Sequence, residues 1–169
     1  QRYAFFTNEE GGIMDDLMVA NFGDHLFVVV NAACKEQDIA HLSANLPESV
    51  ELELIEDRAL LALQGPKAAE VLARIAPEVS EMVFMDARSI EILGEPCLVS
   101  RSGYTGEDGY EISVSAGKAQ ELARTLTEFA EVEWIGLGAR DSLRLECGLC
   151  LYGHDLDTTT TPVEASLLW

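Results

Sequence analysis

The sequence predicts an α+β fold in which antiparallel sheets are flanked by helices. Short apolar runs occur in neighbouring pairs, glycine-, asparagine- or aspartate-containing links join them, and segments with helical spacing fall singly between the pairs. Strands joined by short links pair antiparallel, because a parallel connection needs a crossover of about a dozen residues or more. With 169 residues, 48% of them hydrophobic, the chain is long enough to bury a core. The recurring β-β-α order suggests ferredoxin-like halves.

The first third of the chain predicts three strands and a helix. Residues 3–7 read as a strand, and after a turn at 8–12 the run Ile13–Asn21 returns as its hairpin partner. Residues 26–30 are continuously apolar and predict a buried strand. Residues 35–46 change to helical spacing.

The middle of the chain repeats this pattern. A helix opened by residues 64–67 is predicted with Pro66 in its first turn, where a missing N–H is tolerated. The expected strands are 51–55, 59–63, 88–93, 96–100 and 110–114, with a second helix at 118–129 and a third entered from the glycines at 136 and 138.

Composition excludes several classes of function. The net charge of -19 argues against nucleic acid as a partner, because phosphate binding needs a basic surface. No apolar run approaches the roughly 18–20 residues that span a bilayer, so no membrane partner is expected. Cys147 and Cys150 form one C-x-x-C without a second pair, and the histidines are far apart, so we expect no metal site and a reducing compartment.

Asp15 and Asp16 stand inside an otherwise apolar strand. Alternation places Asp15 on the face of Ile13, Leu17 and Val19, and Asp16 on the face of Met14, Met18 and Ala20. A carboxylate there is unfavourable without a hydrogen-bond donor or a cation. Two interpretations are open: a structural aspartate that accepts from the N–H groups of Gly11 and Gly12, or a catalytic group.

Two later segments are candidate ligand sites. Residues 101–111 contain three glycines and two tyrosines, which suit a close approach to a flat heterocycle but equally suit a tight hairpin loop. In residues 136–146, a glycine loop too short for a dinucleotide fingerprint enters a helix, and Arg140 and Arg144 share one face of it, where pairing with surface acids is the simplest interpretation.

Six motifs follow one another along the chain. They are G-G-I-M-D-D-L at 11–17, V-V-N-A-A at 29–33, Q-G-P-K-A at 64–68, S-R-S-G-Y-T-G-E-D-G-Y-E at 100–111, G-L-G-A-R-D-S-L-R-L-E at 136–146 and L-Y-G-H-D-L-D-T-T-T-T-P-V-E-A at 151–165. Each motif alone is weak, but together they extend over nearly the whole chain. In kind and order they resemble the motifs of the glycine cleavage T-protein family.

The resemblance implies an aminomethyltransferase. Such an enzyme takes the aminomethyl group from the lipoyl arm of H-protein, releases ammonia and passes the one-carbon unit to tetrahydrofolate, giving 5,10-methylenetetrahydrofolate without a metal or pyridoxal cofactor. Lipoylated H-protein is the implied partner, and the bacterial cytoplasm or the mitochondrial matrix the implied location. Residues 1–169 would be a partial folate-binding region that lacks its N-terminal part and the C-terminal barrel, with further folate contacts outside this span.

The resemblance also implies roles for individual residues. Asp16 matches the essential aspartate of the family, and Glu111 matches a carboxylate that accepts hydrogen bonds from the pterin edge, where two parallel bonds are favourable. The implied folate-binding residues are Tyr3, Asn31, Tyr104, Glu111 and Arg140. Cys147 and Ser166 depart from the family, which leads us to expect alanine and glycine there.

Two other functions share this fold. One is a non-enzymatic folate-binding relative that maintains iron–sulfur enzymes, although its K-G-C-Y-x-G-Q-E motif is absent here. The other is the folate domain of a sarcosine or dimethylglycine dehydrogenase, which would be fused to a flavin domain.

Overall fold

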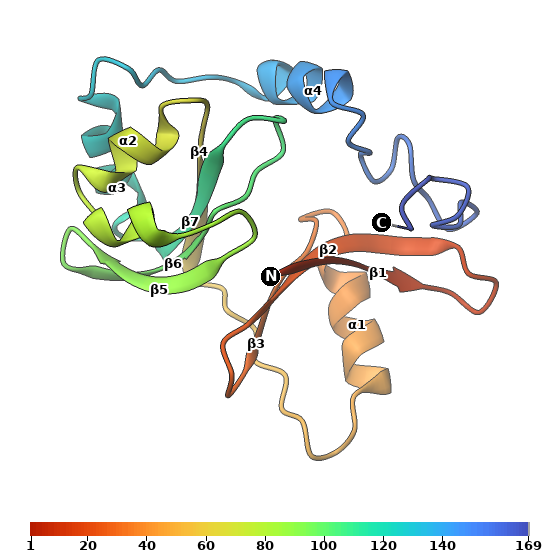
Figure 1. Cartoon of the computed structure of the whole chain (residues 1–169). Coiled ribbons are helices and arrows are strands. Elements are labelled where there is room, and N and C mark those ends of the chain that lie inside the picture. The colour runs from red at the N-terminus through yellow and green to blue at the C-terminus, as the bar shows by residue number, and fades with distance from the viewer. Residues whose placement is uncertain (169) are drawn as a thin grey trace. The chain divides into compact units, whose positions relative to one another are not determined.

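The computed structural model describes residues 1–168, so Trp169, the last residue of the apolar run at 163–169, lies outside it. The chain divides into two compact units. Unit 1 comprises Gln1–Leu54 and the segment from Cys150 onwards, and unit 2 comprises Ile55–Leu149. Figure 1 shows the elements of each unit.

Unit 1 contains a three-stranded antiparallel sheet in the order β1-β2-β3. Its strands are β1 (Arg2–Thr7), β2 (Ile13–Asn21) and β3 (Leu26–Val29), and helix α1 (Lys35–Asn45) follows. The predicted ends of these elements are reproduced to within one residue. The predicted burial of the third strand is wrong, because β3 is only half-buried and Leu26 is 62% exposed.

Side chains alternate between two faces along the first half of β2, as predicted, but only one of the two faces is buried. Ile13, Asp15 and Leu17 are buried, and Asp16 between them is half-buried. The alternation breaks later in the strand, where Ala20 is buried although it was predicted on the other face. The change follows the point at which β2 begins to pair with β3, at Met18.

The segment after Cys150 closes over the β1–β2 turn. The N–H of Ile13 donates to the carbonyl of Thr160 at 2.9 Å. A Cβ on Gly12 would lie 1.9 Å from the backbone oxygen of Thr158, so only glycine allows this approach. Ser166 has a φ of 59°, a left-handed conformation that explains why the family resemblance predicts glycine there.

Unit 2 contains a four-stranded antiparallel sheet in the order β4-β7-β6-β5. Two short helices lie between β4 and the β5–β6 hairpin, and two more helices follow β7. The elements are β4 (Arg58–Gln64), α2 (Ala68–Ala73), the 3-10 helix η1 (Pro77–Glu81), β5 (Ala87–Ile92), β6 (Glu95–Ser100), β7 (Gly109–Ser115), α3 (Ala119–Thr127) and α4 (Leu137–Glu146).

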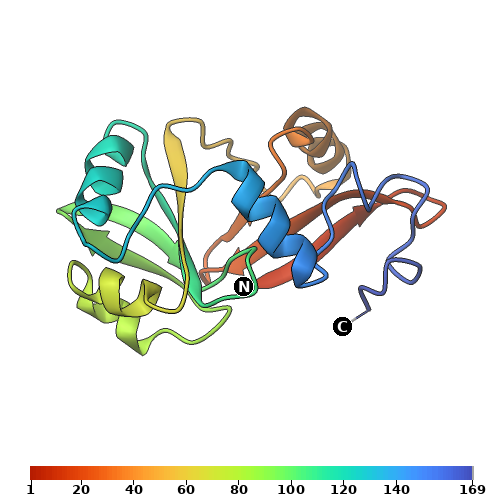
Figure 2. The same ribbon diagram turned by 90° about the horizontal axis from the view of Figure 1, so that it is seen from above.

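The core of unit 2 lies between one face of this sheet and two helices. Tyr110, Ile112 and Val114 alternate along β7 into the same apolar cluster as Leu72 of α2 and Leu122 of α3. Helices α2 and α3 therefore pack against the same face of the sheet; Figure 2 shows the same elements from above. The residues of β7 that alternate with these three apolar ones point to the opposite face of the sheet. The predicted α+β class with antiparallel sheets and flanking helices is confirmed.

Two predicted elements differ from the structure: one lies at the boundary between the two units and the other in unit 2. Residues 51–55 form no strand, although they alternate as one would, because no described strand pairs with them; Leu52 and Leu54 are 40% and 49% exposed. Helix α2 begins at Ala68 with Lys67 as N-cap, so Pro66 lies in the preceding turn and not in the first helical turn.

Candidate functional site

Three of the predicted site residues meet on the sheet of unit 1. The hydroxyl of Tyr3 donates to Asp16 Oδ2 at 2.7 Å, and Asn31 Nδ2 donates to Asp16 Oδ1 at 2.6 Å. Tyr3 pairs with Met18 across β1 and β2, which makes it the diagonal neighbour of Asp16 on the same face. Asn31 follows the end of β3. Antiparallel pairing thus gathers residues far apart in the sequence around one carboxyl group.

The environment of Asp16 moves its pKa in opposing directions. Burial raises the pKa of this carboxyl, the hydrogen bonds from Tyr3 and Asn31 lower it, and the neighbouring Asp15 raises it; the balance is a raised pKa. Asp16 is thus a half-buried acid with two fixed donors.

Removing the Tyr3 hydroxyl tests this balance. In Tyr3→Phe one donor to the charged form is lost, so the pKa of Asp16 should rise further. If turnover needs the charged carboxylate, the acidic limb of the kcat–pH profile should move to higher pH. The measurement is the pH profile of the complete protein and of Tyr3→Phe. An unshifted limb would show that the hydroxyl does not stabilise the charge.

Asp15 is fully buried and is also bound by Asn31. The backbone N–H of Asn31 donates to Asp15 Oδ2 at 3.1 Å, and its Nδ2 donates to Oδ1 at 2.9 Å. The interpretation in which Gly11 and Gly12 satisfy Asp15 is wrong, because the N–H of Gly12 donates instead to Asn8 Oδ1 at 2.7 Å. Asn31 therefore links the two aspartates.

Arg140 and Tyr104 meet within unit 2. The guanidinium of Arg140, on α4, lies 4.8 Å from the centre of the Tyr104 ring, a cation–π arrangement. Arg144 on the same helix pairs with Asp141 at 2.8 Å and is 4% exposed. The two arginines thus differ: Arg144 is a buried structural residue, whereas Arg140 stacks on a predicted ligand-binding aromatic.

Glu111 lies on β7, on the face opposite the core. Its Oε2 accepts a hydrogen bond from Ser102 Oγ at 3.2 Å, and that hydroxyl lies 2.8 Å from Ser100 Oγ. Glu111 pairs with Ala62 and Ser100 on the flanking strands, so its carboxylate is held at mid-sheet.

Comparison with known proteins assigns the family. The family model of the GCVT N-terminal domain matches residues 1–169. The chain belongs to this family. It is 47% identical to a mitochondrial aminomethyltransferase of Dictyostelium discoideum over 99% of the chain and 46% of that protein. It is 51% identical to the mitochondrial aminomethyltransferase of Mus musculus over 98% of the chain and 43% of that protein.

A solved structure agrees with this assignment. The crystal structure of glycine cleavage system aminomethyltransferase T from Bartonella henselae superimposes with a TM-score of 0.87 at 42% identity, covering 99% of the chain and 46% of that structure. The T-protein resemblance is therefore confirmed, and these relatives give no support to the two alternative functions. The chain spans less than half the length of each relative named here.

Gln64 is a residue of this T-protein domain that sequence analysis did not single out. Its Nε2 donates to the carbonyls of Ser102 at 3.0 Å and Tyr110 at 3.3 Å, and its Oε1 accepts from Thr105 Oγ1 at 3.2 Å. It thus fastens the loop that carries Tyr104 to β4. The Q-G-P-K-A motif was the available signal, but contacts some 40 residues away are invisible in sequence.

Gly106 in the same loop has a φ of +78°, and a Cβ there would lie 2.0 Å from Cys147 Sγ. Gly106→Ala should destabilise the protein by about 1–3 kcal/mol through strain and overpacking. Since Cys147 stands where the family predicts alanine, Cys147→Ala should restore part of that loss. Urea unfolding of both single variants and the double variant measures the coupling; additive losses would show that Cys147 is not the obstacle.

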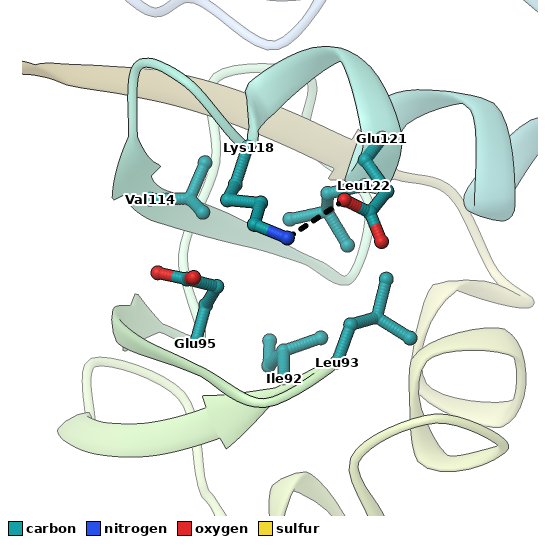
Figure 3. Close-up of a pocket in the computed structure, with 7 residues that line it drawn as sticks. All are labelled: Ile92, Leu93, Glu95, Val114, Lys118, Glu121 and Leu122. Carbon is teal, nitrogen blue, oxygen red and sulfur yellow. Dashed lines mark hydrogen bonds and ion pairs between the residues drawn. The ribbon is translucent and has the colours of Figure 1, made fainter.

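The shallow hollow of unit 2 shown in Figure 3 is not this site. None of the six predicted site residues lines it, and Lys118 there pairs with Glu121 at 3.0 Å. Among residues 1–168, no group of three or more His, Cys, Asp or Glu side chains is arranged to hold a metal ion, and the four cysteines are free thiols. No described helix is long and apolar enough to cross a membrane.

Proposed function

We propose that this chain is the folate-binding part of a glycine cleavage aminomethyltransferase. The reaction moves the one-carbon unit of aminomethyl-lipoyl H-protein to tetrahydrofolate, releasing ammonia and forming 5,10-methylenetetrahydrofolate. The observation that supports it most is the Asp16 carboxyl held by Tyr3 and Asn31, in a chain that is 47–51% identical to proteins named aminomethyltransferase.

Asp16 is the proposed catalytic residue. In its charged form it places fixed negative charge beside the folate nitrogen and the cationic one-carbon centre, where charge changes during the transfer. A preorganised group acts strongly in such a position, because it needs no reorientation as the reaction proceeds. The two donors from Tyr3 and Asn31 supply that preorganisation.

Tetrahydrofolate is the proposed co-substrate. The Glu111 carboxylate would accept hydrogen bonds from the pterin edge, while Tyr104 offers an aromatic face and Arg140 a positive charge for the folate carboxylates. Tyr3 and Asn31 would complete the folate-binding set. No metal or pyridoxal group is assigned a role.

The remaining assignments follow from the family. We propose lipoylated H-protein as partner, and a bacterial cytoplasm or mitochondrial matrix as location; the Dictyostelium and mouse relatives are named mitochondrial. We also propose that residues 1–169 act within a longer protein that supplies an N-terminal part and a C-terminal barrel.

The test uses the complete protein. Ammonia release is measured with aminomethyl-loaded H-protein, with and without tetrahydrofolate, and folate binding by calorimetry. The expected result is folate-dependent ammonia release. Folate binding without release would favour the non-enzymatic relative, and absence of both would reject the proposal.

A further inference from the structure

A buried acidic pair lies beneath Asp16 in unit 1. Asp15 of β2 is 0% exposed and Asp38 of α1 is 1% exposed. Neither carboxyl oxygen of Asp38 accepts a hydrogen bond from a donor group. The Asp15 carboxyl is the neighbouring group within hydrogen-bonding reach. The ion pairs among residues 1–168 involve neither aspartate.

Two adjacent buried carboxylates without a cation are strongly unfavourable when both are charged. One proton between them removes the repulsion and turns the contact into a hydrogen bond. Asp15 is already an acceptor, since it receives two hydrogen bonds from Asn31. Asp38 receives none, so it is the member suited to carry the proton and donate it.

We propose that Asp38 is held as a neutral carboxylic acid that donates a hydrogen bond to Asp15 and, through Asp15 and Asn31, positions Asp16. The chain of contacts is continuous: Asp38 to Asp15, Asp15 to Asn31, and Asn31 Nδ2 to Asp16 Oδ1 at 2.6 Å. Asp38 is therefore a positioning residue. The positioning step rests on the proposed function, whereas the protonation of Asp38 does not.

The surrounding groups favour this protonation. Burial, and then Asp15, raises the pKa of Asp38 to about 7. The thiol of Cys34, just before α1, is neutral because burial and the aspartates raise its pKa to about 12. Burial first, and then the neighbouring acidic groups, raise the pKa of Tyr152 in the C-terminal segment. Asp15 of β2, Cys34 at the start of α1 and Tyr152 of the C-terminal segment thus supply no positive charge to Asp38.

The first experiment observes the proton directly, without substrate. In the complete protein carrying ¹³C-labelled aspartate, side-chain NMR should show one carboxyl that stays protonated at about pH 5.5, well above the ordinary aspartate pKa of about 3.9. That signal should vanish in Asp38→Asn and persist in Glu36→Gln, the control on the exposed side of the same helix turn. An Asp38 signal that is already charged at this pH would overturn the proposal.

A second readout is stability against pH. A folded-state pKa raised from 3.8 to about 7 means that the folded protein binds the extra proton, so stability should fall as pH rises from about 4 to 7. Asp38→Asn should flatten this part of the dependence, and Glu36→Gln should leave it as in the wild type. Equal slopes in the wild type and Asp38→Asn would contradict the protonated state.

The third experiment tests positioning. Asn can still donate to Asp15 whereas Ala cannot, so Asp38→Ala should lower kcat by about ten- to a hundredfold, the range for a misplacement of about 1 Å or less. Asp38→Asn should recover most of that loss, with the KM for tetrahydrofolate little changed in both. Equal losses in the two variants, or a larger loss in Asn, would reject positioning by a donated hydrogen bond. An inactive wild type would count against the proposed function alone, because the NMR result stands without turnover.

Discussion

Asp16→Asn should lower turnover about a hundred- to thousandfold, the usual effect of removing one preorganised electrostatic group. The substitution keeps the shape of the side chain and some of its hydrogen bonding. It removes the charge that Tyr3 and Asn31 hold in place at 2.7 and 2.6 Å. Tetrahydrofolate affinity should change far less, because we propose that Glu111, Arg140 and the aromatic residues share the binding.

Asp15→Asn is the matched comparison, one residue away on the opposite face of β2. Asp15 is fully buried, and Asn31 donates to both of its oxygens. The NH₂ group of an asparagine at this position would face one of the N–H donors of Asn31. The main effect should therefore be a loss of stability of about 1–3 kcal/mol. Turnover per folded molecule should fall less than in Asp16→Asn.

The experiment is steady-state ammonia release from aminomethyl-loaded H-protein, with folate binding and urea unfolding measured on each variant of the complete protein. Near-normal turnover in Asp16→Asn would remove Asp16 from the reaction. A larger loss in a properly folded Asp15→Asn would move the catalytic charge to Asp15.

Local sequence signals predicted most of the strands. β2 was predicted with its observed bounds, Ile13–Asn21, because its apolar run is limited on both sides by turn residues. The same reasoning failed at residues 51–55, where alternation is present but a partner strand is not. A strand forms only where a second strand pairs with it. Alternation of apolar and polar residues does not show whether the tertiary structure provides that second strand.

The sequence named candidate site residues but did not predict most of the contacts between them and the rest of the fold. The placement of Tyr3 beside Asp16 follows from hairpin register, which the turn at 8–12 helps to fix. The links made by Gln64 and Asp38 join residues in different elements, and no local pattern predicts the contacts of either side chain. Asp38 in particular reads as an ordinary first-turn acid of a helix, yet it is buried against Asp15.

Glu111→Ala should weaken tetrahydrofolate binding by about 1.5–3 kcal/mol, the range for a hydrogen bond to a charged group, or roughly ten- to over a hundredfold in Kd. Glu111→Gln separates charge from shape, because an amide oxygen accepts one bond while its NH₂ opposes a pterin donor; its loss should approach that of Ala. Ser102→Ala removes the 3.2 Å contact that orients Glu111 and the 2.8 Å contact with Ser100 but keeps the carboxylate, so its effect should be smaller. Glu91 is an exposed glutamate on β5 of the same sheet, so Glu91→Ala should leave the affinity unchanged.

Calorimetry on the complete protein decides between the outcomes. Wild-type affinity in Glu111→Ala would remove this carboxylate from the folate site. An equal loss of affinity in Glu91→Ala would attribute the effect to the net charge of the sheet.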